Sequence, residues 1–286
     1  MGALTLAFVL AQATPVVAAG TEVRALTATI LDKQGAAVEG LGGDDVALLE
    51  NGLARDITSF RPDRRPLSVA VLVDTSEVMR TDYRLSVVEA VTGFVSRLPL
   101  DTSYAIWTTG DRPTKILDYT EDKAAASKAL LKVFPQGGNY MLDAVSEASR
   151  DLGKLTREGD RTAVVAVTAT GPEFSYRDKY RAAEEAERSA DLFLAVQIDT
   201  GRADFDMRSS LSYVLDRLAR ASGGTYEVIL SSLGVDSALR KLSPWLGAGY
   251  RIAYATVPDL KKRKLELTVA RPDTKVVLPA ASESGP

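Results

Sequence analysis

The sequence of 286 residues contains no cysteine and no histidine. The absence of cysteine excludes disulfides, thiol nucleophiles and thiolate metal sites. The absence of histidine removes the most common general base and a principal zinc ligand. Any bound metal ion would therefore be held by oxygen atoms alone. The sequence also lacks the Ser-x-x-Lys and Gly-x-Ser-x-Gly hydrolase motifs, so we expect no enzyme.

An excess of positive charge is also missing. Lysine and arginine number 35 against 38 aspartate and glutamate, which gives a formal net charge of −3. The sequence therefore lacks the excess of basic residues that is typical of nucleic-acid-binding proteins. We expect no nucleic-acid partner, no small-molecule substrate and no cofactor. With 45% hydrophobic and 26% charged residues, the composition is that of an ordinary globular protein.

Long hydrophobic runs are absent except near the N-terminus. Residues 3–11 are apolar and are followed by two small-residue cleavage patterns, Ala11-Gln12-Ala13 and Val17-Ala18-Ala19. This pattern predicts a signal-peptide-like segment over residues 1–19, although the usual basic start is missing. We expect an exported protein, periplasmic or extracellular. Whether the segment is cleaved or kept as an anchor is left open, as is peripheral membrane association through an envelope complex.

Two regions carry strand signals. Residues 23–30 alternate between apolar and polar or small side chains, as in a half-buried strand. Residues 46–49 and 54–60 are predicted strands around Asn51-Gly52, a strong hairpin signal because both residues tolerate positive φ. Further strands are predicted over 250–256, 265–269 and 274–278. The basic run 261–264 is interpreted as a solvated hairpin turn between the first two of these.

Neither β region has enough strands for a stable core alone. We therefore predict one discontinuous, β-sandwich-like domain made of residues 20–65 and 247–279, with a disordered tail over 280–286. Between its halves, residues 66–246 alternate strands and helices. Residues 67–73 and 162–168 are almost wholly apolar, as in parallel strands buried on both faces. An amphipathic helix is predicted over 82–98. The predicted fold is thus α/β, with a doubly wound, mostly parallel Rossmann-like sheet inserted into the β-domain.

A polar loop follows the first of these buried strands. Asp74-Thr75-Ser76 stands at its carboxyl end, the edge where ligands bind in open parallel sheets. The placement resembles a von Willebrand factor type A domain. Over about residues 21–279 the chain resembles the exported "VWFA-related" proteins of acidobacteria. Three stretches carry the likeness: residues 31–60, the segment from Pro66 to Ser76, and Gly249-Tyr250-Arg251-Ile252 with Arg271-Pro272.

The resemblance implies a metal-ion-dependent adhesion site. In the family an Asp-x-Ser-x-Ser loop, a threonine from a second loop and an aspartate from a third hold Mg²⁺ in an octahedron of oxygens. Here Asp74 and Ser76 match the pattern. Val78, Asn139 and Ala169 stand where the second serine, the threonine and the second aspartate belong. We expect these positions to form a ligand-binding surface without a tight Mg²⁺ ion.

Several compensations for the lost carboxylate are compatible with the sequence. Glu77 lies inside the loop and Glu173 just after the third loop, and either side chain could supply charge to a metal ion. Alternatively, Arg80 or Arg112 could pair with Asp74, because a buried carboxylate must be paired or protonated. A further alternative leaves Asp74 in contact with water.

Two function classes follow. The first is a non-catalytic, exported scaffold or interaction module, a candidate subunit of a larger envelope assembly, which binds a protein partner without Mg²⁺. The alternative is metal-dependent adhesion through a remodelled site of Asp74, Ser76 and Asn139, with Glu77 as a further ligand.

Overall fold

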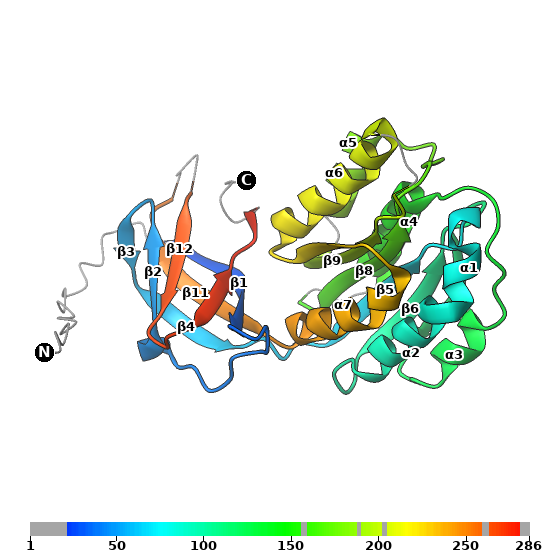
Figure 1. The fold of residues 1–286 in the computed structure, drawn as a ribbon. Coiled ribbons are helices and arrows are strands. Elements are labelled where there is room, and N and C mark those ends of the chain that lie inside the picture. The colour runs from blue at the N-terminus through cyan, green and yellow to red at the C-terminus, as the bar shows by residue number, and fades with distance from the viewer. Residues whose placement is uncertain (1–21, 156–158, 188–189, 202–204, 259–262, 281–286) are drawn as a thin grey trace, which may run out of the picture.

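The computed structural model describes residues 22–155, 159–187, 190–201, 205–258 and 263–280. They form a layered α/β unit and, beside it, two smaller antiparallel sheets (Figure 1). The segment predicted as a signal peptide and residues 281–286 of the predicted tail lie outside the described residues. No described helix combines the length and the hydrophobicity needed to cross a bilayer.

The central sheet has six strands in the order β10-β9-β8-β5-β6-β7. They are β5 (Leu67–Val73), β6 (Ser103–Thr108), β7 (Thr114–Thr120), β8 (Arg161–Ala169), β9 (Leu192–Ile198) and β10 (Thr225–Ile229). Neighbouring strands pair in parallel, except that β7 runs antiparallel to β6. Every residue of β8 and β9 is buried, which explains why these segments read as continuous apolar runs.

Helices cover both faces of this sheet. They are α1 (Arg80–Asp82), α2 (Val88–Ser96), α3 (Ala125–Leu130), α4 (Met141–Leu155), α5 (Lys179–Glu187), α6 (Phe205–Ser222) and α7 (Val235–Leu242). Residues of α2, α3 and α7 share one apolar core with the sheet, and those of α4, α5 and α6 share the other. This arrangement confirms the predicted doubly wound α/β fold.

The two antiparallel sheets combine both ends of the chain. Their strands are β1 (Glu22–Asp32), β2 (Val46–Glu50), β3 (Leu53–Arg55), β4 (Ile57–Pro62), β11 (Gly249–Thr256), β12 (Leu265–Val269) and β13 (Thr274–Val277). One sheet has the order β13-β1-β11-β4 and the other β12-β2-β3. Together they enclose a third apolar core that includes Ile30, Leu48 and Ile252. The β-region before the α/β unit thus pairs with the one after it.

Strand connections differ from the prediction in two places. The Asn51-Gly52 turn joins β2 and β3 as expected, and both residues have positive φ. The predicted strand 54–60, however, breaks at Asp56: β3 stays with β2, while β4 pairs with β11 in the other sheet. Likewise β11 and β12 lie in different sheets, so no hairpin joins them. In a sandwich a strand can bend from one sheet to the other, and apolar patterning alone does not mark the change.

The basic run after β11 is not simply a solvated turn. Arg263 is only 2% exposed, and its guanidinium donates to Glu50 Oε1 at 2.6 Å and to Thr256 Oγ1 at 2.7 Å. Glu50 is fully buried and also accepts from Arg55 at 2.8 Å. The prediction of a solvated turn was wrong for Arg263, because its guanidinium pairs with the buried carboxylate of Glu50 on β2.

The predicted helix over 82–98 is likewise interrupted. The 3-10 turn η2 (Glu77–Met79) leads into α1, and the wider turn η3 (Tyr83–Val87) then separates α1 from α2. Tyr83 is fully buried in this wider turn, and its hydroxyl donates to the Leu130 carbonyl at 2.9 Å. The first of these turns, η2, follows directly after the loop that carries Asp74.

Candidate functional site

Loops from three adjacent strands meet at the carboxyl edge of the central sheet. Asp74 follows β5, Thr109 follows β6, and Thr168-Ala169 ends β8. Because β5 lies between β6 and β8, these loops converge on Asp74. Asn139 reaches the same point from the segment before α4. The strand order thus assembles a site from residues far apart in the sequence.

The Asp74 carboxylate lies at the centre of this site and is 1% exposed. Its Oδ1 accepts a hydrogen bond from the Ser76 amide at 2.9 Å. Its Oδ2 accepts three, from Asn139 Nδ2 at 2.8 Å, from Thr168 Oγ1 at 3.0 Å and from the Ala169 amide at 3.1 Å. The alternative in which Asp74 stays in contact with water is therefore wrong.

Asn139 acts as a donor toward this carboxylate. It is 4% exposed, and its Oδ1 accepts from Thr109 Oγ1 at 2.7 Å. Its Nδ2 therefore faces Asp74 and Thr168 Oγ1, the latter at 2.9 Å. The amide oxygen, the atom that would ligate a metal ion, is bound to Thr109 instead. Burial raises the pKa of Asp74 above its usual range, while the hydrogen bonds from the Ser76 and Ala169 amides act to lower it.

Close backbone contacts hold the loops together. The amides of Gln136 and Glu77 donate to the carbonyls of Thr75 and Gly137 at 2.9 and 3.0 Å. The Gly110 amide donates to Thr75 Oγ1 at 2.9 Å. A Cβ atom on Gly110 would lie 2.4 Å from the Thr75 carbonyl oxygen, so this position requires glycine. The site is thus a tightly packed element rather than an open crevice.

The charged residues proposed to compensate for the lost carboxylate lie elsewhere. Glu77 is exposed and pairs with Arg80 at 2.5 Å. Glu173 accepts from the Leu142 amide at 3.2 Å and the Ser175 amide at 3.0 Å, which ties its loop to the start of α4. Neither Arg80 nor Arg112 contacts Asp74 in the described part of the chain. Neutral donors, rather than arginines, satisfy this carboxylate.

The donor set does not fit a hard divalent cation. Val78 packs beside Gly171 and Ala169 is 1% exposed, and neither side chain carries an oxygen. Ser76 matches the first serine of the family motif. Its Oγ is buried and has no hydrogen-bond partner. Across the described residues, no group of three or more acidic, cysteine or histidine side chains is placed to hold a metal ion. The site thus offers one carboxylate and one serine hydroxyl, where the family motif has two carboxylates and three hydroxyls.

Sequence reasoning missed two members of the site, Thr109 and Thr168. Both are buried hydroxyl residues at the carboxyl ends of β6 and β8. Threonine is frequent in strands for packing reasons, so its presence there did not indicate a role. The available signal was position: each hydroxyl ends a strand adjacent to the strand that precedes Asp74.

A cluster of aromatic side chains lies next to Asn139 in the sequence and in space. Tyr140 lies within 6.3 Å of Phe174 and 5.9 Å of Tyr176, measured between ring centroids. Phe174 is 52% exposed and Tyr176 is 91% exposed. We call Tyr140, Phe174 and Tyr176 the aromatic rim. Phe134, 73% exposed, instead lies with its ring centroid 5.0 Å from the Arg84 guanidinium.

The protein thus has an open, doubly wound sheet whose loops meet around one acidic residue, Asp74. Residues 69–171 match the family model of the von Willebrand factor type A domain. The chain therefore contains a von Willebrand factor type A domain, which confirms the resemblance to that domain.

Solved structures share the fold. The chain is similar to a von Willebrand factor type A protein from Catenulispora acidiphila, with a TM-score of 0.54 and 12% identity over 90% of this chain and 71% of that chain. It is also similar to proximal thread matrix protein 1 of the mussel byssus, with a TM-score of 0.53 and 19% identity over 70% of this chain and 50% of that chain. In one crystal structure of the mussel protein, zinc occupies the adhesion-site motif. No curated protein matches the sequence.

Proposed function

We propose that this protein is a non-catalytic interaction module that binds a protein partner through the carboxyl edge of its central sheet, without a bridging metal ion. Von Willebrand factor type A domains generally mediate protein interaction or adhesion. The observation that carries the proposal is the saturation of Asp74 by Ser76, Asn139, Thr168 and Ala169. Oδ2 accepts three of these four hydrogen bonds and has no lone pair left for a partner-bridging ion, while Oδ1 accepts one.

The aromatic rim supplies an alternative source of binding energy. Tyrosine and other aromatic side chains bury large areas at low entropic cost and dominate the energetics of many interfaces. Phe174 N donates to the Asn139 carbonyl at 2.7 Å, so the rim is fixed to the same segment that satisfies Asp74. We propose that the buried polar cluster holds the rim rigidly, and that the rim contacts the partner.

The proposal includes export. The signal-like pattern of residues 3–19 and the lack of cysteine are compatible with an envelope or extracellular protein. A scaffold or subunit role in an envelope assembly agrees with a sequence that lacks cysteine, histidine and the two hydrolase motifs named above.

One observation favours the alternative of metal-dependent adhesion. Ser76 Oγ is buried without a partner, and zinc occupies the corresponding motif of the mussel protein. In that alternative Asp74, Ser76 and Asn139 would ligate the ion, which requires the Asn139 amide to rotate away from Thr109.

The deciding experiment is capture of the partner from the native envelope fraction by the full chain, with and without a chelator. Tyr176→Ser is expected to reduce capture at least tenfold. Leu100→Ser is the matched control, because Leu100 is 90% exposed but lies before β6, at the opposite end of the sheet. Capture that depends on Mg²⁺ or Mn²⁺ and is lost in Asp74→Ala, or capture unaffected by Tyr176→Ser, would overturn the proposal.

A further inference from the structure

Four arginines gather where the β-sheets join the α/β unit. Arg61 lies on β4, Arg64 and Arg65 lie in the linker to β5, and Arg251 lies on β11. In the antiparallel pairing of β4 with β11, Arg61 and Arg251 stand directly opposite each other. Like charges at opposed positions of a sheet are destabilising. The arrangement therefore favours a counter-charge at this point.

The protein supplies part of that counter-charge itself, from Asp63 and from Asp191. Arg65 donates to both carboxylate oxygens of Asp63, at 2.7 and 2.6 Å, and Arg161 lies 3.5 Å from the same carboxylate. Asp63 is thus shared between two arginines. Among the described residues, Arg61, Arg64 and Arg251 form no ion pair. A chain of net charge −3 consequently concentrates unpaired positive charge at one place.

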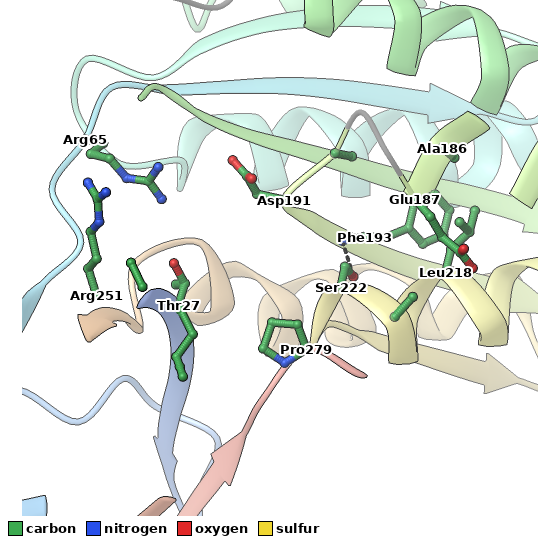
Figure 2. Close-up of a pocket in the computed structure, with 14 residues that line it drawn as sticks. Thr27, Arg65, Ala186, Glu187, Asp191, Phe193, Leu218, Ser222, Arg251 and Pro279 are labelled. Carbon is green, nitrogen blue, oxygen red and sulfur yellow. Dashed lines mark hydrogen bonds between the residues drawn. The ribbon is translucent and has the colours of Figure 1, made fainter. Parts of the chain in front are cut away.

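The unpaired arginines line a cavity. A hollow of about 460 Å³ is bounded by Arg61, Pro62, Asp63, Arg64, Arg65 and Arg251. A second hollow of about 320 Å³ shares Arg65 and Arg251 with the first and extends between Thr27 of β1 and Ser222 of α6, with the acidic residues Asp191 and Glu187 in its wall. The unpaired arginines therefore face the first hollow, whose lining contains one carboxylate, Asp63. Figure 2 shows Arg65 and Arg251 entering from different elements, with their guanidinium groups at the same end of the second hollow. The combined crevice has room for far more than a bridging water, whose share of liquid volume is about 30 Å³.

We propose that this arginine crevice binds a ligand carrying phosphate groups, with a diphosphate as the smallest adequate unit. A carboxylate carries one charge and is satisfied by one bidentate guanidinium. A phosphate carries up to two charges and accepts from several guanidinium groups at once. Three unpaired arginines around one cavity therefore match phosphate better than carboxylate. The crevice precedes β5 whereas Asp74 follows it, so the two sites lie roughly 20 Å apart along the strand.

The test uses the full chain and inorganic pyrophosphate at about 50 mM salt, where charge interactions are only partly screened. Saturable one-site binding is expected, weakened roughly tenfold by Arg251→Gln and by Arg61→Gln. Arg240→Gln is the control, because Arg240 is exposed on α7 and pairs with Asp236. Without ligand, the Arg251→Gln and Arg61→Gln variants should melt no lower than wild type, since each relieves a like-charge contact.

A second experiment distinguishes two kinds of phosphate-containing ligand, a membrane lipid and a soluble molecule. Sedimentation with vesicles of cardiolipin, a lipid whose headgroup carries two phosphates, competed by pyrophosphate, would assign a lipid headgroup, and absence of vesicle binding would assign a soluble ligand. The proposal is overturned if pyrophosphate does not saturate below about 10 mM, where the binding free energy is under 3 kcal/mol. It is equally overturned if citrate binds as tightly, or if Arg240→Gln weakens binding as much as Arg251→Gln does.

Discussion

Asn139 Nδ2 lies 2.8 Å from Asp74 Oδ2, so a neutral amide donor faces this buried carboxylate oxygen. The amide is oriented by Thr109, whose hydroxyl donates to the other end of the same side chain at 2.7 Å. The carboxylate and the amide thus form one buried unit, and its stability should depend on both.

Asn139→Ala removes a donor from a fully buried carboxylate and an acceptor from Thr109. We expect a loss of about 1–3 kcal/mol in the free energy of unfolding, the usual effect of leaving a buried group unsatisfied. Urea denaturation of the full chain measures it. Gln136→Ala is the control, because Gln136 is an exposed neighbour whose side chain bonds only Asp111, at 3.0 Å. Equal losses in the two variants would contradict a special role for Asn139.

Much of the fold is predictable from apolar patterning. β5 and β12 have the bounds expected from the sequence, because each is a short apolar or alternating run between polar turns. What patterning could not show is which sheet a strand joins. Asp56 marks the point where the chain passes from one sheet to the other, and no feature of that residue distinguishes a bend from a continuous strand.

The sequence predicted which residues lie at the Asp74 site, but not the hydrogen bonds between them. Asp74, Ser76, Val78, Asn139 and Ala169 follow from the spacing of the family motif. The orientation of the Asn139 amide depends on Thr109, a residue outside that motif. The burial of Asp74 depends on loops contributed by three strands. Both are properties of the tertiary structure. The spacing of the motif therefore left open whether Asp74 contacts water, binds a metal ion or pairs with an arginine.

Gly110→Ala tests the packing of the loops. The added Cβ would lie 2.4 Å from the Thr75 carbonyl oxygen and 2.8 Å from that of Gln136, both backbone atoms that cannot move independently. We expect a destabilisation of about 1–3 kcal/mol, as for overpacking elsewhere. Thermal unfolding provides the measurement. Gly153→Ala within α4, where a Cβ meets nothing within 4 Å, is expected to be neutral or to stabilise by up to about 1 kcal/mol.

Glu50 and Arg263 form a buried ion pair with side-chain exposures of 0% and 1%. Glu50→Gln leaves the Arg263 charge without its carboxylate, which typically costs about 3–5 kcal/mol. The double variant Glu50→Leu with Arg263→Met removes both charges and should lose less than Glu50→Gln. A denaturation series on these variants measures the coupling. Lys264→Ala, in an exposed pair with Glu266, should change stability by no more than about 1 kcal/mol.

Asp63 should make folding sensitive to acid. Burial acts to raise its pKa, but the hydrogen bond from Arg65 and the charge of Arg161 outweigh burial, so the pKa lies below its ordinary value of 3.8. The ionised group therefore contributes stability that is fully present above the unfolded-state pKa and is lost as the pH falls through the folded-state pKa. Asp63→Asn should cost about 3–5 kcal/mol at neutral pH.

This cost should shrink as the pH falls below 3.8, because the wild-type carboxyl becomes protonated as well. Urea denaturation of both proteins across the acid range checks this. Asp273→Asn removes an exposed partner of Lys33 and should cost less than about 1 kcal/mol at every pH. A cost for Asp63→Asn that stays constant to the lowest pH would refute the assignment.

Restoring the family motif should restore metal binding. The triple variant Val78→Ser, Asn139→Thr and Ala169→Asp supplies the missing hydroxyls and the second carboxylate around Asp74. Without metal it should be less stable than wild type, because a second carboxylate is buried next to the first. With Mg²⁺ or Mn²⁺, calorimetry should show saturable binding with a Kd below about 1 mM. At about 10 mM metal, a Kd of 1 mM corresponds to roughly 1.4 kcal/mol of added stability.

Two comparisons make this result decisive. Asp74→Ala in the triple-variant background should abolish the binding heat, since it removes the carboxylate on which the motif is built. Wild type should give no saturable heat under the same conditions, because its Asp74 is occupied by the Asn139 amide, the Thr168 hydroxyl and two backbone amides. If wild type instead binds Mn²⁺ as tightly as the triple variant, hydrogen-bond saturation does not exclude the ion, and the metal-independent mode of partner binding must be abandoned.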